Sequence, residues 1–170
     1  WLYIGHVSEV ASAGDFRVRK MGRQPVIMIR GRDDAVRVFM NRCRHRGAAV
    51  CEVESGNTKF LRCWYHGWIY DTVGKLVEVT QREAYGPDFN QEAMGLTPAA
   101  RMEIYRGFVF ASLATTGPTL REHLGNAAAM IDLMVEASPI GELAVDAGSH
   151  KTVYRGNWKL VGMDGYHPNF

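Results

Sequence analysis

Cysteines and long apolar runs are scarce in this sequence, and each shortage excludes a class of protein. Three cysteines among 170 residues cannot all pair, so the chain is not a disulfide-stapled miniprotein, and a reducing compartment is expected. No apolar run approaches the roughly 18 residues that a membrane-spanning helix needs, and nothing resembles a secretory signal. The sequence therefore predicts a cytoplasmic protein with no membrane attachment.

A strong charge of either sign is also lacking. The chain has 20 Lys and Arg against 18 Asp and Glu, which leaves a net charge of +2. A nucleic-acid interface needs clustered positive charge, so the balance predicts no nucleic-acid partner. Apolar residues make up 46% and charged residues 22%, which excludes a disordered chain. The length suits one ordinary domain, or one domain and the start of another.

Short runs rich in β-branched residues fill the first hundred-odd positions. Residues 26–30 and 35–39 flank the turn formers at 31–34, which is typical of a β-hairpin. Many short strands separated by glycines predict an antiparallel β-sandwich or barrel. The other expected strands lie at residues 2–4, 16–18, 59–61, 76–79 and 104–113.

The pattern changes to that of helices near residue 116. Thr119 and Glu122 have the spacing of a capping box, so a helix is expected to start there. Gly125 and Asn126 are expected to divide the helical stretch in two. Apolar residues at steps of three and four then form one packing face, which we expect to include Met134 and its neighbour Met130. The face comprises Leu120, Leu124, Ala128, Ile131, Met134 and Val135.

Two short segments each combine one cysteine, one histidine and a following glycine. Cys43 and His45 form C-x-H, Cys63 and His66 form C-x-x-H, and 17 residues separate His45 from Cys63. Thiolate and imidazole are ligands for zinc or iron. Two such loops suit a binuclear centre in which one iron takes both thiolates and the other both imidazoles, as in a Rieske [2Fe–2S] cluster. The competing interpretation is a zinc-stabilised β domain that serves as a binding module, although zinc modules usually present C-x-x-C knuckles.

These segments resemble those of a known family, the large or α subunits of the Rieske non-haem iron aromatic ring-hydroxylating oxygenases. The similarity continues to the chain end and spans nearly all of the sequence. It implies a Rieske domain over residues 1–115, an antiparallel β-sandwich with two cluster-binding hairpin loops. Residues 116–170 would begin an α+β catalytic domain, and we expect the chain to be a fragment. The matching motifs are Cys43-x-His45-Arg46-Gly47, Cys63-x-Tyr65-His66-Gly67-Trp68, Gly107-Phe108-Val109-Phe110, Gly156-Asn157-Trp158-Lys159 and Asp164-Gly165-Tyr166-His167.

The resemblance also implies a second metal site. His167 would be a ligand of a mononuclear Fe(II), whose other histidine and carboxylate ligands would come from later residues. Asp164 would be a catalytic carboxylate that bridges this iron site to a cluster-ligand histidine, His66, of a neighbouring subunit. One departure from the family pattern is that only residues 160–163 separate the Asn-Trp-Lys motif from Asp164, about one helical turn fewer than usual.

Cofactors, partners and activity follow from the same resemblance. Electrons would pass from NADH through a reductase, with or without a ferredoxin, to the [2Fe–2S] cluster. The mononuclear Fe(II) would activate O₂ to hydroxylate a small aromatic substrate, by cis-dihydroxylation or monooxygenation, in the catabolism of aromatic hydrocarbons. The assembly would be a homotrimer, with or without β subunits. The alternative is a Rieske-type ferredoxin, an electron carrier with no catalytic centre, which would need neither the helical segment nor the Asp164–His167 motif.

The residues around the loops bear on the redox potential. Respiratory Rieske proteins have extra cysteines and a hydrogen-bonding serine where this chain has Ala48, Tyr65 and Trp68, while Tyr70 remains as a donor. Fewer hydrogen bonds to sulfur predict a potential toward the low end of the roughly −150 to +300 mV Rieske range. The third thiol, Cys51, is expected to be a buried structural cysteine.

Several side chains near the loops have both a structural and a functional interpretation. Arg42, Arg44 and Arg46 either form a solvated loop or dock an acidic electron-transfer partner. Trp64 and Trp68 are expected to shield the centre from water. The remaining histidines, His6, His123 and His150, are expected to be structural.

Overall fold

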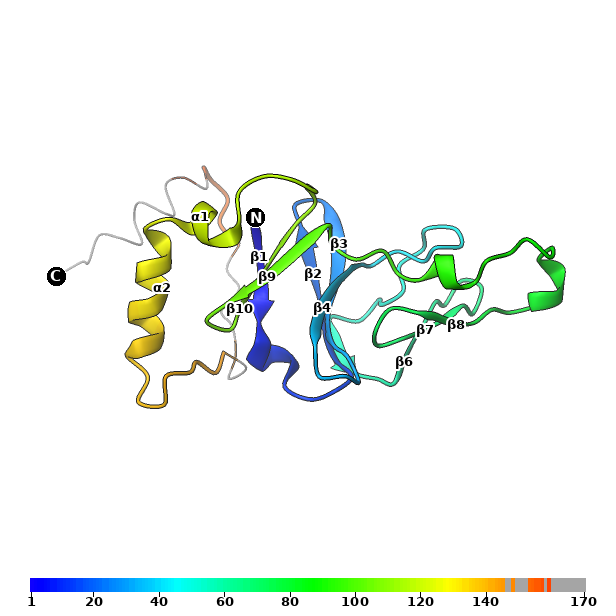
Figure 1. The fold of residues 1–170 in the computed structure, drawn as a ribbon, viewed down its shortest axis with the longest axis horizontal. Helices are drawn as coiled ribbons and strands as arrows, with labels where there is room; N and C mark the ends of the chain where they lie inside the picture. The colour runs from blue at the N-terminus through cyan, green and yellow to red at the C-terminus, as the bar shows by residue number, and fades with distance from the viewer. Residues whose placement is uncertain (146–147, 149–152, 158, 160–170) are drawn as a thin grey trace.

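The computed structural model describes residues 1–145, 148, 153–157 and 159. Its strands form three antiparallel sheets that lie in a row along the molecule, which confirms the predicted mainly β fold (Figure 1). The strand orders are β1-β10-β9, β4-β3-β2-β5 and β6-β7-β8. The strands are β1 Leu2–His6, β2 Asp15–Met21, β3 Gln24–Arg30, β4 Val36–Met40, β5 Ser55–Asn57, β6 Phe60–Arg62, β7 Ile69–Asp71, β8 Leu76–Glu78, β9 Arg101–Tyr105 and β10 Phe108–Ser112.

Strand β3 is buried on both of its faces and separates two apolar cores. Ile27 and Ile29 pack into the core that extends beneath β6–β8, whereas Val26 and Met28 pack into the core that includes β1 and β10. Successive side chains of a strand point to opposite faces, so a strand with a core on each side reads as an unbroken apolar run. This explains why the hairpin of β3 and β4 was predictable from its composition.

Residues 104–113, predicted as one strand, instead contain the end of β9, a tight turn and the whole of β10. Strand β9 ends at Tyr105, which pairs with Phe108 at the start of β10. The two residues between them, Arg106 and Gly107, both have positive φ, at 51° and 88°. Positive φ at both central positions is what a two-residue type I′ connection requires, and its twist matches that of the flanking strands. Strand β1 pairs with β10, so the N-terminus joins the sheet formed by residues 101–112.

The helical segment begins and divides as predicted. Thr119 caps α1 (Leu120–Leu124) in a capping box with Glu122, and α2 (Ala127–Glu136) follows after Gly125. Leu120, Ala128 and Val135 are buried. Met134, which the periodicity assigned to the packing face, is 53% exposed, and Met130 on the same helix, also expected to pack, is 65% exposed. Among the described residues, no helix combines the length and apolarity that crossing a membrane requires.

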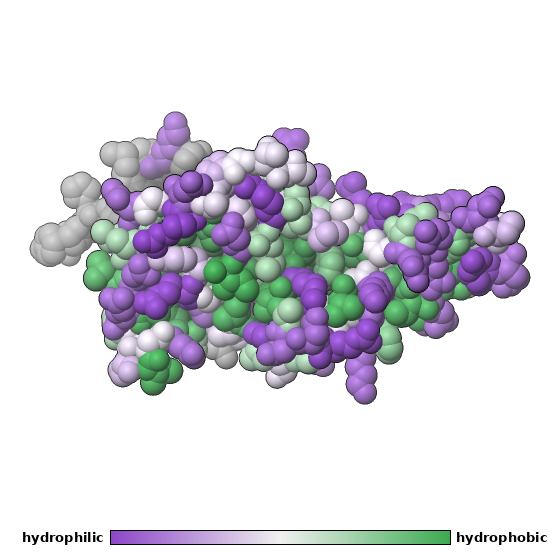
Figure 2. All heavy atoms as spheres, viewed as in Figure 1, coloured by the Kyte–Doolittle hydropathy of each residue, from purple (hydrophilic) through white to green (hydrophobic). Residues whose placement is uncertain are grey.

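Three short 3₁₀ helices complete the described structure: η1 Val7–Val10, η2 Arg82–Ala84 and η3 Glu92–Met94. The segment that carries η2 and η3 extends beyond β8 to the end of the molecule opposite the α-helices (Figure 1). In the view of Figure 2, polar side chains cover most of this end. Two loops lie between this segment and the β3 core, and we call residues 42–49 loop 1 and residues 63–68 loop 2.

Candidate metal centre

Loop 1 and loop 2 have the same backbone hydrogen bonds although their sequences differ. In each loop the cysteine N–H donates to the carbonyl oxygen five residues later, and the glycine N–H four residues after the cysteine donates back to the cysteine carbonyl. Each loop therefore closes around its cysteine as a tight turn. The bonds run from Cys43 to Ala48 (2.8 Å), Gly47 to Cys43 (2.9 Å), Cys63 to Trp68 (2.8 Å) and Gly67 to Cys63 (2.9 Å).

The glycine in each loop is required by the backbone. Gly47 and Gly67 have φ of +77° and +72°, in the left-handed region that L side chains rarely adopt. A Cβ on Gly67 would also lie 2.7 Å from the Thr80 Oγ1 atom, so the segment after β8 packs directly on loop 2. The glycines that follow the two histidines in the sequence thus set the curvature of the loops.

The two loops bring a pair of thiols together in the core. Cys43 and Cys63 are 3% and 1% exposed. Burial raises the pKa of the Cys43 thiol, the hydrogen bond from Tyr70 opposes that rise, and the neighbouring Cys63 adds to it. Two buried thiols side by side become thiolates when a bound cation offsets their charge, because a coordinating thiol is deprotonated outright. The pair is therefore suited to a metal.

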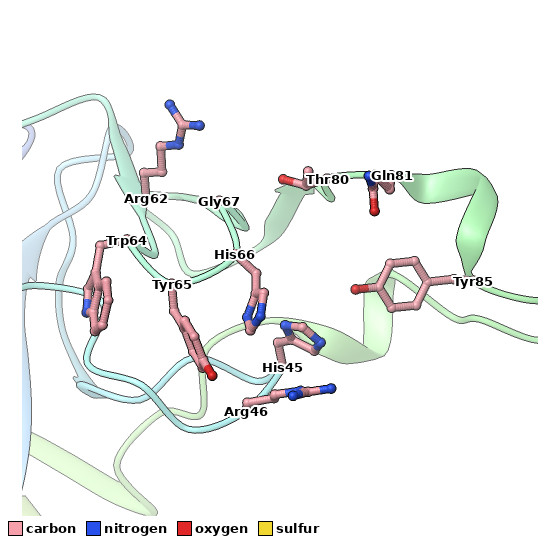
Figure 3. A pocket seen from close by; sticks show the side chains of 10 residues that line it. All are labelled: His45, Arg46, Arg62, Trp64, Tyr65, His66, Gly67, Thr80, Gln81 and Tyr85. Atoms are coloured by element: carbon pink, nitrogen blue, oxygen red, sulfur yellow. The ribbon is translucent and has the colours of Figure 1, made fainter.

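The two histidines form a second pair at the surface side of the thiols. Their rings lie 4.5 Å apart between centroids, and both face the same pocket (Figure 3). Burial, with the nearby His66 and Arg46, lowers the pKa of His45, so its imidazole is neutral near pH 7. Its Nδ1 atom is buried and has no hydrogen-bond partner. A buried lone pair without a partner is costly, and a metal ion bound at that atom would satisfy it.

The four side chains are arranged as two pairs and not as one cluster. Within the described part of the chain, no group of three or more His, Cys, Asp or Glu side chains converges on a single metal position. A structural zinc ion takes four ligands at one position. A binuclear centre with two thiolates on one iron and two imidazoles on the other needs pairs. The geometry therefore fits the binuclear centre better than the zinc alternative.

Aromatic side chains enclose the imidazole of His45. The ring of Trp68 stacks on it at 4.9 Å and 9°, and Trp68 is 1% exposed. The Trp68 indole Nε1–H donates to the Tyr85 hydroxyl at 3.3 Å, and Tyr85 points toward His45 from the segment after β8 (Figure 3). Trp64 was expected to share this shielding, but it is 62% exposed. Trp68 and Tyr85 together cover one side of the His45 imidazole.

Tyr70, on β7, links the two loops. Its hydroxyl oxygen accepts a hydrogen bond from the Arg44 backbone N–H at 3.0 Å and lies 3.2 Å from Cys43 Sγ. Because the backbone N–H only donates, the phenol proton is available to donate to the sulfur. Burial raises the pKa of Tyr70, so the phenol keeps this proton. The donor expected from the sequence is thus directed at one of the thiols.

The sequence profile of the Rieske [2Fe-2S] domain family matches residues 1–98. The chain belongs to the Rieske [2Fe-2S] domain family. Membership of this family supports a [2Fe–2S] cluster as the cofactor of the chain. The match covers β1 to β8, both loops and the segment that carries η2 and η3.

Relatives of this Rieske domain confirm the resemblance to oxygenase α subunits. The N,N-dimethyl phenylurea N-demethylase subunit alpha of Sphingobium sp. (strain YBL2) is 40% identical over 94% of this chain and 35% of its own length. The biphenyl dioxygenase subunit alpha of Metapseudomonas furukawaii is 40% identical over 98% of this chain and 38% of its own length. Naphthalene 1,2-dioxygenase from Rhodococcus sp., solved with indole bound, has a TM-score of 0.78 at 35% identity, over 82% of this chain and 32% of that one. The chain therefore spans about a third of the length of these proteins.

The structure brings together some of the predicted site residues and leaves others aside. Cys43, His45, Cys63 and His66 come together where loop 1 and loop 2 meet. Cys51 is buried outside both loops, and burial raises the pKa of its thiol to about 12, as expected for a structural cysteine. The predicted residues of the second metal site, Asp164 and His167, lie outside the described residues, as does His150.

Two residues of the site were not predicted from the sequence. Tyr85 is distant from both motifs, and only the folding back of the segment after β8 brings it to the centre. Asn41 was visible as a polar residue beside the first motif, and it is buried at 3% exposure with three hydrogen bonds to the backbone after loop 1. The signal that could have identified it is a polar residue directly after a strongly apolar strand, where a buried side chain needs hydrogen-bond partners.

Proposed function

We propose that Cys43 and Cys63 bind one iron and His45 and His66 bind the other iron of a Rieske [2Fe–2S] cluster. The observation that carries the proposal is the pairwise arrangement, with two thiols in the core and the unpartnered Nδ1 of His45 beside them. When bound, the cluster supplies a one-electron carrier. The loop hydrogen bonds hold the ligand atoms in place, and Trp68 and Tyr85 limit access of water.

The potential of this carrier depends on the hydrogen bonds that reach its sulfur ligands. Tyr70 provides one, to Cys43. Trp68 offers only its indole N–H, which donates to Tyr85 instead. We therefore expect a potential toward the low end of the roughly −150 to +300 mV range of Rieske centres. A low potential suits an electron donor to oxygen chemistry.

Tyr70→Phe tests this account of the potential. The substitution removes the hydrogen bond to Cys43 Sγ that stabilises the more negative, reduced state, so we expect a lower midpoint potential. The measurement is a redox titration followed by electron paramagnetic resonance. Tyr65→Phe is the matched control because Tyr65 lies in loop 2 but is 49% exposed. An equal shift in both variants, or no shift in either, would mean that the Tyr70 hydrogen bond does not tune the cluster.

We propose further that the longer protein is a Rieske-type aromatic ring-hydroxylating oxygenase, with a Rieske domain at 1–115 and the start of its catalytic domain at 116–170. The pairing of β1 with β10 supports the first boundary, because it ties both ends of residues 1–112 into one sheet. Helices α1 and α2 and the α-subunit names of the relatives favour this assignment over a ferredoxin-type carrier. A mononuclear Fe(II), when bound, would activate O₂ to hydroxylate a small aromatic substrate.

His167 is proposed as a ligand of that iron. Asp164 is proposed as the carboxylate that bridges the iron site to His66 of a neighbouring subunit. The support is the Asp-x-Tyr-His motif and the position of His66 at an open pocket of about 690 Å³. An imidazole at the surface is accessible to a carboxylate from another copy of the chain in a homotrimer. In the full-length enzyme, Asp164→Asn should retain both metals and abolish electron transfer between them, as measured by single-turnover reoxidation of the cluster. Unimpaired reoxidation of the cluster would mean that Asp164 is not needed for electron transfer between the two metal sites.

A reductase, directly or through a ferredoxin, is the proposed source of electrons from NADH. Four exposed arginines surround the loops: Arg42, Arg44, Arg46 and Arg62. None of them forms an ion pair with a carboxylate in the described part of the chain. The two pockets beside the loops have no acidic lining residue. Unpaired positive charge favours an acidic partner, so the rate at which the reductase or ferredoxin reduces the cluster should fall as ionic strength rises. A rate that is independent of ionic strength would contradict an acidic partner.

Electron paramagnetic resonance of the dithionite-reduced chain, with iron, sulfide and zinc determined on the same sample, tests the central proposal. We expect the signal of a mixed Cys/His-ligated centre, with about two irons and two sulfides per chain. One zinc per chain and no signal would replace the redox function with a structural metal site. The measurement needs no substrate, so it is independent of the proposed oxygenase reaction.

A further inference from the structure

Loop 2 is closed at its base by a β-ladder. Strands β6 and β7 flank the loop, and Leu61, two residues before Cys63, pairs with Tyr70, seven residues after it. The same pairing continues on either side, from Arg62 to Ile69 and from Phe60 to Asp71. The position of the loop 2 ligands is therefore set by an ordinary pair of antiparallel strands.

Loop 1 lacks the second strand of such a ladder. Strand β4 leads into the loop and ends at Met40, but residues 50–52 after the loop belong to no strand. The two positions that correspond to Leu61 and Tyr70, counted from the cysteine, are Asn41 and Val50. Both are buried, like Leu61 and Tyr70. Buried backbone groups need partners, so some other group must take the place of the missing strand.

The side chain of Asn41 takes that place. Its Oδ1 atom accepts hydrogen bonds from the backbone N–H groups of Val50 and Cys51, at 2.8 and 2.9 Å. Its Nδ2 atom donates to the carbonyl oxygen of Cys51 at 2.7 Å. A single amide thus satisfies three backbone groups across the base of loop 1. The Asn41 backbone is fixed in turn, because its N–H donates to the carbonyl oxygen of Pro25 at 2.9 Å.

We infer that Asn41 is a positioning residue that sets where loop 1 places Cys43 and His45. One residue separates Asn41 from Cys43, whose N–H makes the next bond across the loop, to Ala48. Loss of the amide would let the two ends of the loop separate and would shift both ligands together. The inference rests on the proposed ligand assignment and adds to it a residue that does not itself contact the cluster.

Asn41→Leu is the decisive variant, because it gives loop 1 the residue that loop 2 has at the same position, with similar volume and no amide. It leaves two buried N–H groups and one carbonyl without their partner. Supporting groups of this kind typically change metal affinity by about 10- to 100-fold. We therefore expect iron loss to a chelator to be roughly tenfold faster or more, with altered g values in the reduced chain.

Two further variants separate positioning from stability. Asn57→Leu is the control, because the exposed Asn57 also joins two segments, through Ala13 and Asp15, but touches neither loop. It should lower the melting temperature and leave the g values and iron loss unchanged. Asn41→Asp keeps an acceptor for both N–H groups and should fall between Asn41→Leu and the wild type, which keeps the inference testable if Asn41→Leu does not fold.

The outcomes distinguish this inference from the proposed function. Wild-type g values and iron retention in Asn41→Asp and Asn41→Leu, with only a lower melting temperature, would overturn the positioning role and leave the cluster intact. Changes of the same size in Asn57→Leu would also overturn it, because they would reflect general loss of stability. A wild-type chain with no Rieske-type signal would overturn the proposed function and the inference together.

Discussion

Cys63→Ala should reduce the iron and sulfide of the purified chain to below about a tenth of the wild-type content. Cys63 is one of the two buried thiols that loop 1 and loop 2 bring together. We expect an iron that loses one of its two proposed protein ligands to be released together with its sulfides. Metal-binding energy in such domains contributes directly to folding, so the variant should also unfold at a lower temperature.

Cys51→Ala provides the matched control. Cys51 belongs to the same apolar core as Cys43 and Cys63 and is nearly as buried. Burial raises the pKa of its thiol to about 12, so it is a neutral, inert group. Its removal leaves a small cavity that costs about 1 kcal/mol, with iron content unchanged.

The comparison between the two variants tests the ligand assignment directly. Equal loss of iron in both would make Cys51 a ligand, and the assignment would be wrong. Retention of iron in Cys63→Ala would show that the pair of thiols is not the binding site. Iron and sulfide analysis, with circular dichroism to verify folding, separates these cases.

The parts of the fold that sequence predicted well are those that depend on neighbouring residues. The capping box of Thr119 and Glu122 lies within one turn, and its two residues meet whatever the rest of the chain does. The β3–β4 hairpin is equally local, since its turn formers lie between its strands. The two Cys/His segments are equally short, and each folds into a tight turn that keeps its cysteine and histidine close together.

What could not be predicted depends on contacts between distant segments or on competition between patterns. The turn within residues 104–113 was not predicted from the sequence, because Arg106 adopts a positive φ that few non-glycine residues favour. Met134 lies on the apolar face that the helical period predicts, and it is still exposed. The period identifies the residues that share a face of the helix, but it does not show whether another segment packs on that face. Tyr85 contacts Trp68, and Asn41 contacts Cys51, only in the folded chain, so neither contact could be predicted from local sequence.

Trp68→Ala should be the most destabilising core substitution near the site. Trp68 is 1% exposed, belongs to the core cluster beneath the loops, and stacks on His45. Removing a buried aromatic side chain of this size costs about 3–5 kcal/mol through lost burial and the remaining cavity. A chain of this length is stabilised by only about 5–15 kcal/mol in total, so the melting temperature should fall sharply.

The same substitution should raise the midpoint potential of the chains that still hold a cluster. With the proposed two thiolate and two neutral imidazole ligands, the oxidised centre would carry no net charge and the reduced centre one negative charge. Water admitted beside His45 should therefore stabilise the reduced form. Trp68→Phe keeps an aromatic ring over His45 but removes the N–H to Tyr85, so its potential should stay near that of the wild type. Redox titration and thermal unfolding of both variants measure the two effects. A Trp68→Ala potential equal to that of Trp68→Phe would mean that Tyr85 alone keeps water from the centre, because the indole would then contribute to packing and not to the potential.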